Sequence, residues 1–182
     1  MHLLDQIPLV TRGVTDDGDT VGVTLSRTYD ASDVDLWEAL TDPSRLEHWF
    51  EPVSGDLRVG GTVRCEGGVT AEILACTPEQ LLRLAWDDGT PGTLEAVLSP
   101  AERGTRLTLT HTVPRDEHWD TYGPAVVGIG WDSSLAALAL HLAMDTEAVE
   151  GEEETFIRRL AVEWSGADGQ QAHRTVELYL GE

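Results

Sequence analysis

The chain has 182 residues and a formal net charge of −21, and 41% of its residues are hydrophobic. This length and apolar content predict one folded domain with a short addition and exclude a wholly disordered chain. All 12 basic residues are arginine. The absence of lysine excludes a Walker phosphate loop, a pyridoxal-phosphate enzyme and a kinase. The negative charge disfavours nucleic acid and anionic membranes as partners.

Features of targeting and of disulfide bonding are absent from the sequence. No run approaches the ~18 apolar residues of a membrane span. The first residues lack the basic and apolar regions of a signal peptide, so we expect a cytoplasmic protein. Cys65 and Cys76 form no CxxC pair, and we expect two free thiols.

Residues 1–20 are predicted to form an N-terminal arm that ends in a polar turn. After it, Val21, Val23 and Leu25 alternate with small or polar residues. Such alternation predicts the first strand, with one buried face.

Two short helices are predicted to follow. Ser32 is a good N-cap for the first, and Trp37 and Leu40 share its apolar face. Pro43 suits the first turn of the second, which ends in the aromatic pair Trp49 and Phe50.

Residues 53–113 alternate between short strand patterns and turn signals, which is typical of an antiparallel sheet. Side chains in a strand alternate between its two faces. In the last strand His111 therefore shares an apolar face with Leu109 and Val113. By the same parity Trp86 points inward.

The longest helical pattern follows, and we expect a helix from about Tyr122 to Met144. Its apolar stripe consists of Val127, Trp131, Leu135, Leu138 and Leu142. Gly128 and Gly130 interrupt the pattern, each at a cost of roughly 1 kcal/mol relative to alanine. We therefore expect a close approach there, either of a packed neighbour or of a ligand.

Residues 145–182 differ in character from the rest. An acidic run predicts a linker, and two amphipathic patterns containing Phe156, Trp164 and Tyr179 predict a helical extension. We expect this tail to be peripheral and to pack on the body or on a second copy. The chain is therefore either a monomer or a dimer formed through the tail.

Strands grouped together with helices at the ends predict an α+β fold. We expect a curved antiparallel sheet of about six to seven strands wrapped around the long C-terminal helix. The domain would span residues 21–144, between the arm of residues 1–20 and the extension of residues 145–182. A cavity is expected between helix and sheet.

The element order and several motifs resemble the START and pollen-allergen-like helix-grip superfamily (SRPBCC). Within it, the chain is most similar to homologues of the heat-shock ATPase activator and to polyketide cyclase-like proteins. The matching segments are residues 36–43, 46–50, 55–61, 84–86, 104–111 and 128–131. The resemblance covers about residues 20–143, and the tail resembles a two-helix extension seen in some bacterial members.

The resemblance implies several functions without choosing among them. Members bind lipids, hormones or polyketides, some are cyclases or dehydratases, and some are co-chaperones. One small group protects antibiotic producers by intercepting a reactive enediyne. In such a protein an exposed glycine would be the reacting site, and Gly123, Gly128 and Gly130 are the candidates.

Large aromatic side chains make good walls for a mostly apolar ligand. Inward parity and the helical stripe indicate some of the cavity residues, and the resemblance places Trp49, Phe50, Trp119 and Tyr122 at its mouth. The candidate ligand-binding residues are Trp49, Phe50, Trp86, His111, Trp119, Tyr122, Val127, Gly130, Trp131 and Leu135. We assign no catalytic residue and no cofactor, and the six histidines show no metal-site spacing.

Three hypotheses follow. The first is a binding protein for a hydrophobic small molecule such as a polyketide, including self-resistance by sequestration. The second is a polyketide cyclase or dehydratase, which would need convergent polar groups inside the cavity. The third is a co-chaperone-like interaction protein, which would act through its surface. His111 has a structural alternative in each case, as a core histidine satisfied by a neighbouring carbonyl.

Overall fold

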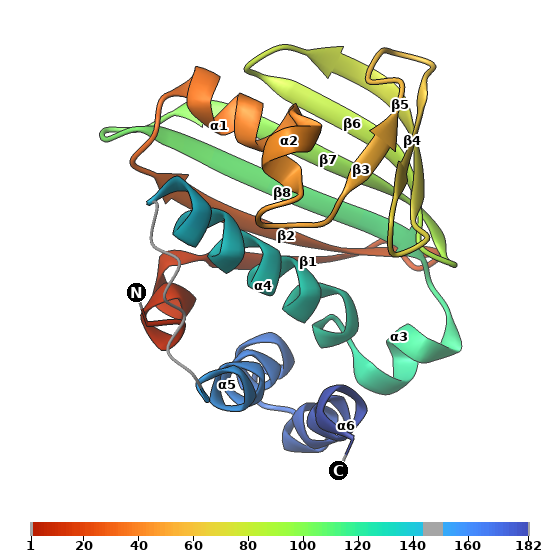
Figure 1. Ribbon diagram of the computed structural model, residues 1–182. Coiled ribbons are helices and arrows are strands. Elements are labelled where there is room, and N and C mark those ends of the chain that lie inside the picture. The colour runs from red at the N-terminus through yellow and green to blue at the C-terminus, as the bar shows by residue number, and fades with distance from the viewer. Residues whose placement is uncertain (1, 144–150, 182) are drawn as a thin grey trace.

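The computed structural model describes residues 2–143 and 151–181. Within these residues, eight strands form one antiparallel sheet in the order β1-β2-β8-β7-β6-β5-β4-β3. The strands are β1 Thr11–Asp16, β2 Thr20–Tyr29, β3 Val53–Gly55, β4 Thr62–Cys65, β5 Thr70–Thr77, β6 Leu81–Asp87, β7 Pro91–Pro100 and β8 Thr105–Pro114. The sheet curves over the helices (Figure 1).

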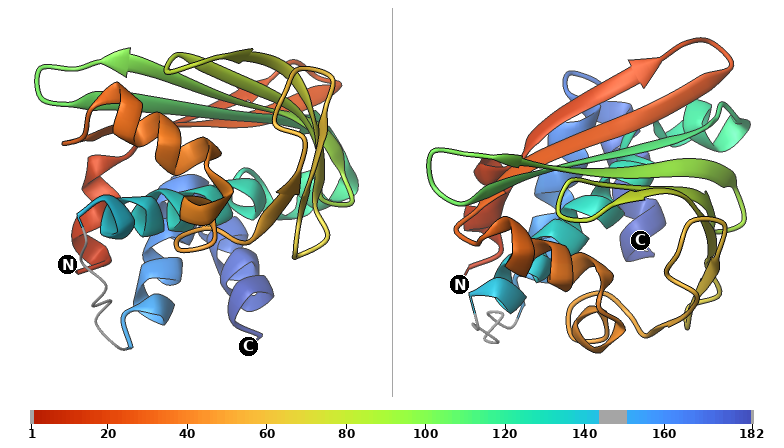
Figure 2. Two further views of the ribbon diagram at one scale, coloured as in Figure 1. Left: turned by 45° about the horizontal axis from the view of Figure 1, so that its top comes forward. Right: turned by 90° about the horizontal axis from the view of Figure 1, so that it is seen from above.

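The helices form two further layers on one side of the sheet. They are the 3-10 helix η1 Leu4–Leu9 and the α-helices α1 Asp33–Thr41, α2 Pro43–Leu46, α3 Glu117–Tyr122, α4 Ala125–Leu142, α5 Glu153–Ser165 and α6 Gly169–Leu180. Helices α1, α2 and α4 face the sheet, whereas α5 and α6 lie on the far side of α4 (Figures 1 and 2). The predicted α+β helix-grip arrangement is confirmed.

The sheet has more strands than predicted, because residues 1–20 are not a free arm. Residues 11–16 form β1, which pairs with β2 through Arg12 with Leu25 and Val14 with Val23. The strand expected at Val21 is therefore the second in the chain. Strand β1 is an edge strand whose side chains are mostly exposed, so it lacks the alternation that marks a half-buried strand.

Inside the sheet, strand parity is as predicted. Leu107, Leu109, His111 and Val113 of β8 are all buried on its inner face. Trp86 of β6 is buried on the same side of the sheet. β8 lies between β2 and β7, where His111 is paired with Val23 and Leu94. The candidate histidine thus lies on an interior strand of the sheet.

The predicted long helix is α4, which begins three residues later than expected. Gly123, with a φ of +70°, ends α3, and α4 begins after Pro124. A positive φ is accessible to glycine at little cost, and proline cannot continue a preceding helix. Leu135 and Leu138 are buried as expected, and Val127 and Trp131 are half-buried. Met144, the predicted end, lies outside the described residues.

Helix α4 corrects one further expectation. Its 18 residues have a mean hydropathy of 1.4, so by length and composition it could cross a membrane. In this fold it lies between the sheet and the tail helices, and a helix covered on two sides is apolar around most of its circumference. It also carries Asp132, which is paired with Arg12.

The tail is helical and packs on the body, which is one of the two predicted alternatives, but it is less peripheral than expected. Phe156, Leu160, Trp164 and Val176 belong to the same buried core as the inner face of the sheet. Tyr179 donates a hydrogen bond to the carbonyl oxygen of Val126 on α4, at 3.0 Å. Periodicity shows that these helices have an apolar face, but it does not identify the surface that covers it. Residues 145–150 of the predicted acidic linker lie outside the described residues.

Candidate functional site

Four rings meet between the sheet and α4. Trp86 and Trp131 lie with ring centroids 5.5 Å apart, and Phe50 stacks on Trp131 at 6.5 Å with an interplanar angle of 9°. His111 meets Trp131 edge to face at 5.8 Å. Such offset and edge-on contacts are the favoured geometries of aromatic pairs. We call Phe50, Trp86 and Trp131 the aromatic wall, because they border both cavities described below.

Phe50 of the aromatic wall follows α2, and local sequence signals fix the position of this short helix. Asp42 caps α2 by accepting a hydrogen bond from the Ser44 amide at 2.8 Å, and Pro43 occupies the first helical position. The short helix then turns Trp49 and Phe50 towards the sheet. The indole N–H of Trp49 donates to the Ala39 carbonyl at 2.9 Å, which ties this turn to α1.

On one side of the wall lies an apolar cavity of about 380 Å³. Its floor is the inner face of the sheet, and its roof comes from α1, α2 and the segment that follows them. The sheet residues that line it include Val63, Ile73, Leu84, Leu94, Ala96 and Leu109. The helical side contributes Trp37, Leu40, Leu46 and Trp49.

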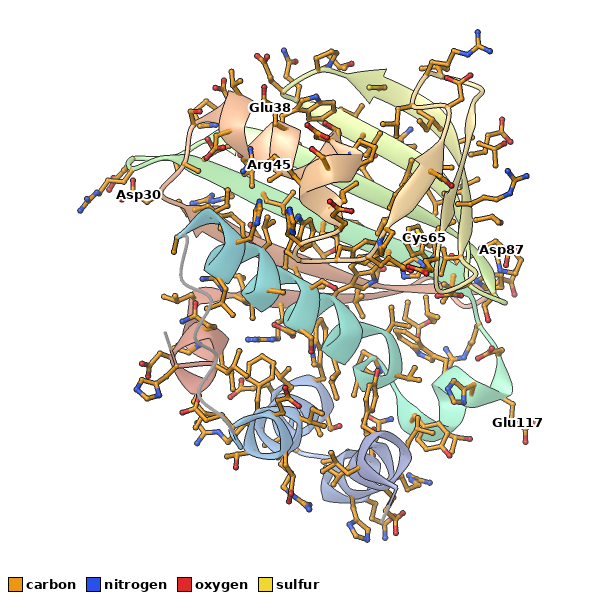
Figure 3. The ribbon with its side chains drawn as sticks, viewed as in Figure 1. Asp30, Glu38, Arg45, Cys65, Asp87 and Glu117 are labelled. Carbon is orange, nitrogen blue, oxygen red and sulfur yellow. The ribbon has the colours of Figure 1, made fainter. Side chains whose placement is uncertain are left out.

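Apart from its tryptophans, the described lining of this cavity has few polar side chains, namely one hydrogen-bonded hydroxyl and two thiols. The hydroxyl of Thr41 donates to the carbonyl of Trp37 at 2.7 Å. Cys65, labelled on β4 in Figure 3, and Cys76 are free thiols. Burial raises the pKa of Cys65 to about 11, and the nearby Glu51 carboxylate adds to the shift. Because the thiolate is the reactive form, Cys65 is a poor nucleophile at neutral pH.

On the other side of the wall lies a second space, which we call the polar cleft, with a volume of about 470 Å³. It opens at the end of the molecule where β6 stops and α3 starts, marked by Asp87 and Glu117 in Figure 3. Three carboxylates border it, from Glu51, Asp88 and Asp116. Trp119, Val127 and Gly130 supply much of the remaining lining.

His111 lies at the inner end of the polar cleft and is 3% exposed. The indole N–H of Trp131 points at its Nδ1, at 3.0 Å. An indole nitrogen can only donate, so Nδ1 must accept and the proton of the neutral ring must be on Nε2. Burial lowers the pKa of His111, although the nearby Asp88 opposes the shift, so the neutral ring is favoured.

The Nε2–H group of His111 is a buried donor without an acceptor among the described residues. Among the described residues, no carbonyl is therefore placed to accept this hydrogen bond, although one is expected for a core histidine. A Cβ atom at Gly92 would lie only 3.2 Å from Nε2 and 2.6 Å from the Thr112 carbonyl oxygen. A larger residue at position 92 would therefore crowd the His111 ring.

The ten candidate residues fall into three groups. The apolar cavity is lined by Trp49, Phe50, Trp86 and Trp131. The polar cleft is lined by Phe50, Trp86, His111, Trp119, Val127, Gly130 and Trp131. Tyr122 and Leu135 line neither: the ring of Tyr122 packs on His118, and Leu135 is buried in the core beside Tyr29. The single cavity that was expected is therefore divided by the aromatic wall.

The opposite side of α4 carries a buried polar cluster that sequence reasoning missed. Asp132 accepts two hydrogen bonds from Arg12, at 2.9 and 2.7 Å, and one from the indole N–H of Trp164, at 2.7 Å. Burial raises the pKa of Asp132, and these donors oppose the shift. The available signal was a lone carboxylate in an otherwise apolar helix, which requires a buried partner.

The two glycines of α4 have different surroundings. A Cβ atom at Gly128 would lie 2.2 Å from the ring of Trp164, so this glycine allows α5 to pack closely. Gly130 is exposed, and a Cβ atom there would meet nothing within 4 Å. Of the two alternatives weighed for these positions, helix packing holds at Gly128, and Gly130 is open towards the polar cleft.

The cavity residues missed from the sequence are mainly the small and aliphatic ones, such as Leu94, Ala96, Ile73 and Val63. Their inward parity was available in the strand pattern, but it does not separate a cavity wall from a packed core. Within residues 2–143 and 151–181, no group of three or more His, Cys, Asp or Glu side chains is placed to hold a metal ion.

A curved antiparallel sheet closed by a long helix, with internal space between them, defines a helix-grip protein. The family model described as Activator of Hsp90 ATPase homolog 1-like protein matches residues 30–143, and the chain belongs to this family. The predicted resemblance is therefore confirmed. No match was found among curated proteins.

Several solved structures are similar to this chain. The crystal structure of CalU16 from Micromonospora echinospora is 28% identical, with a TM-score of 0.71, and the match covers 86% of this chain and 94% of CalU16. DynU16, described as a protein in the dynemicin biosynthetic locus, is 25% identical with a TM-score of 0.62. That match covers 71% of this chain and 48% of DynU16, so it spans about half of the longer protein.

A protein of unknown function from Enterococcus faecalis shares the fold over 98% of this chain and 95% of its own, with a TM-score of 0.67 at 20% identity. The solution structure of CalU16 is matched over 94% of this chain, at 26% identity and a TM-score of 0.66. Coverage this high extends into the tail helices, so the tail belongs to the shared architecture.

Proposed function

We propose that this protein binds a hydrophobic, polyketide-like small molecule in the apolar cavity, and that it acts in secondary metabolism, including self-resistance by sequestration. The observation that carries this proposal is the cavity of about 380 Å³ with its almost entirely apolar lining. Ligand pockets typically enclose about 300–1,000 Å³. The similarity to DynU16, a protein of a biosynthetic locus, supports the choice of ligand class.

The chemistry of the lining favours binding over catalysis. A cyclase or dehydratase needs positioned acids, bases or donors around its substrate. Here the Thr41 hydroxyl is already bonded, the Cys65 thiol has a raised pKa, and His111 lies behind the aromatic wall. The affinity expected for a mostly apolar ligand is micromolar, about −8 kcal/mol.

Calorimetric titration with 1,8-dihydroxyanthraquinone, a planar tricyclic scaffold of the polyketide type, tests the proposal. Ala96 lines the cavity, whereas Ala85 lies on the opposite face of the sheet, so Ala96→Phe and Ala85→Phe are a matched pair. We expect micromolar binding by the wild type and by Ala85→Phe, and at least a tenfold loss in Ala96→Phe, because the added ring fills the cavity.

Circular dichroism checks that both variants are folded. Equal affinity in a folded Ala96→Phe variant would place the ligand elsewhere. Absence of binding by the wild type, repeated over a panel of polycyclic aromatic compounds, would favour the interaction-protein alternative.

A further inference from the structure

The polar cleft has one buried side-chain donor without a partner among the described residues, and the fold determines which atom it is. The hydrogen bond from Trp131 requires Nδ1 of His111 to be the acceptor, so Nε2 carries the proton. No acceptor for Nε2 is present among the described residues, although His111 is 97% buried. Buried donors are normally paired, and an unpaired one beside a cleft is available to an acceptor on a bound molecule.

The charges around the cleft limit what that acceptor can be. Glu51, Asp88 and Asp116 border the cleft. Its described lining contains no arginine, and its one basic side chain besides His111 is His118, whose ring packs on Tyr122. Arg115 is close in sequence, but its guanidinium already pairs with Asp16 at 2.8 Å and Asp120 at 2.7 Å. A carboxylate or phosphate would therefore be repelled, and a neutral oxygen would not.

The rest of the lining suits a ring system attached to that oxygen. Trp119, Val127 and the aromatic wall offer flat apolar surface beside His111. Gly130 leaves the α4 side of the cleft uncovered, since a Cβ atom there would have no neighbour within 4 Å. The cleft thus combines an apolar surface, one buried unpaired donor and a negative border.

We propose that the polar cleft is a second ligand subsite for a neutral carbonyl group on an aromatic skeleton, with the Nε2–H of His111 as the hydrogen-bond donor. This inference rests on the ligand binding proposed above and names the chemistry of the ligand's polar end. Ketones and amides qualify, whereas acids do not.

Two probes that differ by one oxygen test the subsite. They are 1-tetralone, a neutral aromatic ketone, and tetralin, the same skeleton without the carbonyl. Affinities are measured by NMR titration, and the imidazole nitrogens of His111 are followed by ¹⁵N chemical shift. We expect 1-tetralone to bind about fivefold more tightly than tetralin, which is typical of one net hydrogen bond. We also expect the Nε2 resonance to move only with the ketone.

The variant His111→Leu removes the donor. In it, the two probes should bind equally, because the preference for the ketone is read as the ratio of the two affinities within one protein. The carboxylate 1,2,3,4-tetrahydro-1-naphthoate should bind the wild type more weakly than tetralin, because of the negative border. If His111→Leu does not fold, the wild-type Nε2 shift with each probe still decides the proposal.

The outcomes separate this inference from the proposed function. Equal binding of both probes by the wild type, a preference that survives in His111→Leu, or an unmoved Nε2 resonance with 1-tetralone bound would overturn the subsite. Such results would leave binding in the apolar cavity intact, as measured with Ala96→Phe. Failure of every aromatic probe to bind would instead overturn both.

Discussion

On each side of α4 lies a buried polar side chain that is hydrogen-bonded to a tryptophan. The two side chains differ in whether all of their polar atoms are paired. On the side of the tail, Asp132 receives hydrogen bonds from Arg12 and Trp164. On the side of the sheet, His111 receives one from Trp131 and keeps an unused donor. A fully paired buried group stabilises one arrangement of the fold, whereas an unpaired one costs stability unless a ligand completes it. We infer that the tail side holds the helix in place and the sheet side serves binding.

The same difference appears in the glycines. Gly128 is covered by the ring of Trp164, and Gly130 has open space beside it. The two positions are two residues apart on one helix, yet position 128 requires glycine and position 130 tolerates a larger residue. Of the glycines considered as reacting sites, Gly128 and Gly123 are buried and Gly130 is exposed.

The largest expected effect is on the paired side. Asp132→Ala leaves the Arg12 guanidinium, at 11% side-chain exposure, with backbone carbonyl acceptors but without a carboxylate, and it removes the acceptor of Trp164. Removing one partner of a buried ion pair costs about 3–5 kcal/mol. Urea unfolding should show that loss in the free energy of unfolding.

The matched control is Glu95→Gln, which removes the partner of the partly exposed Arg83. Exposed pairs contribute about 1 kcal/mol or less. If Asp132→Ala were no more destabilising than Glu95→Gln, Asp132 would not be the residue that holds α4 to β1 and α5.

The next effect is that alanine substitutions at Gly128 and Gly130 change the free energy of unfolding in opposite directions. Gly128→Ala places a Cβ atom against a rigid, hydrogen-bonded indole, and overpacking of this kind costs about 1–3 kcal/mol. Gly130→Ala meets no neighbour and should gain up to about 1 kcal/mol from helix propensity. Thermal unfolding of the two variants should therefore move the midpoint in opposite directions. Two shifts of the same sign would contradict the packing described for α5.

Much of the fold could be predicted because its central strands are half-buried and its long helix carries a continuous apolar stripe. Parity placed Trp86 and His111 on the inner face, and the stripe of α4 identified Leu135 and Leu138 as buried. Strand β1 could not be found this way, because an edge strand with exposed side chains has no alternation. The start of α4 at Ala125 instead of Tyr122 is set by the positive φ of Gly123 and by Pro124, which the apolar stripe does not show.

The candidate site was less predictable, because its limits are set by rotamers and not by periodicity. The sequence indicates which rings point inward, but the division into two spaces depends on the stacking of Phe50 on Trp131. Likewise, parity places His111 inside without showing which of its nitrogens is bonded. Asp132 was overlooked because its partners come from β1 and α5, both far from it in sequence.

The most direct test of the central claim uses the six tryptophans as reporters, since each indole N–H gives its own NMR signal. Trp86 and Trp131 border both cavities, whereas Trp164 lies on the tail side of α4, bonded to Asp132. On titration with 1-tetralone or 1,8-dihydroxyanthraquinone, the indole signals of Trp86 and Trp131 should shift and that of Trp164 should stay in place. A shift of Trp164 with Trp86 and Trp131 unmoved would contradict the assignment of the two sides of α4.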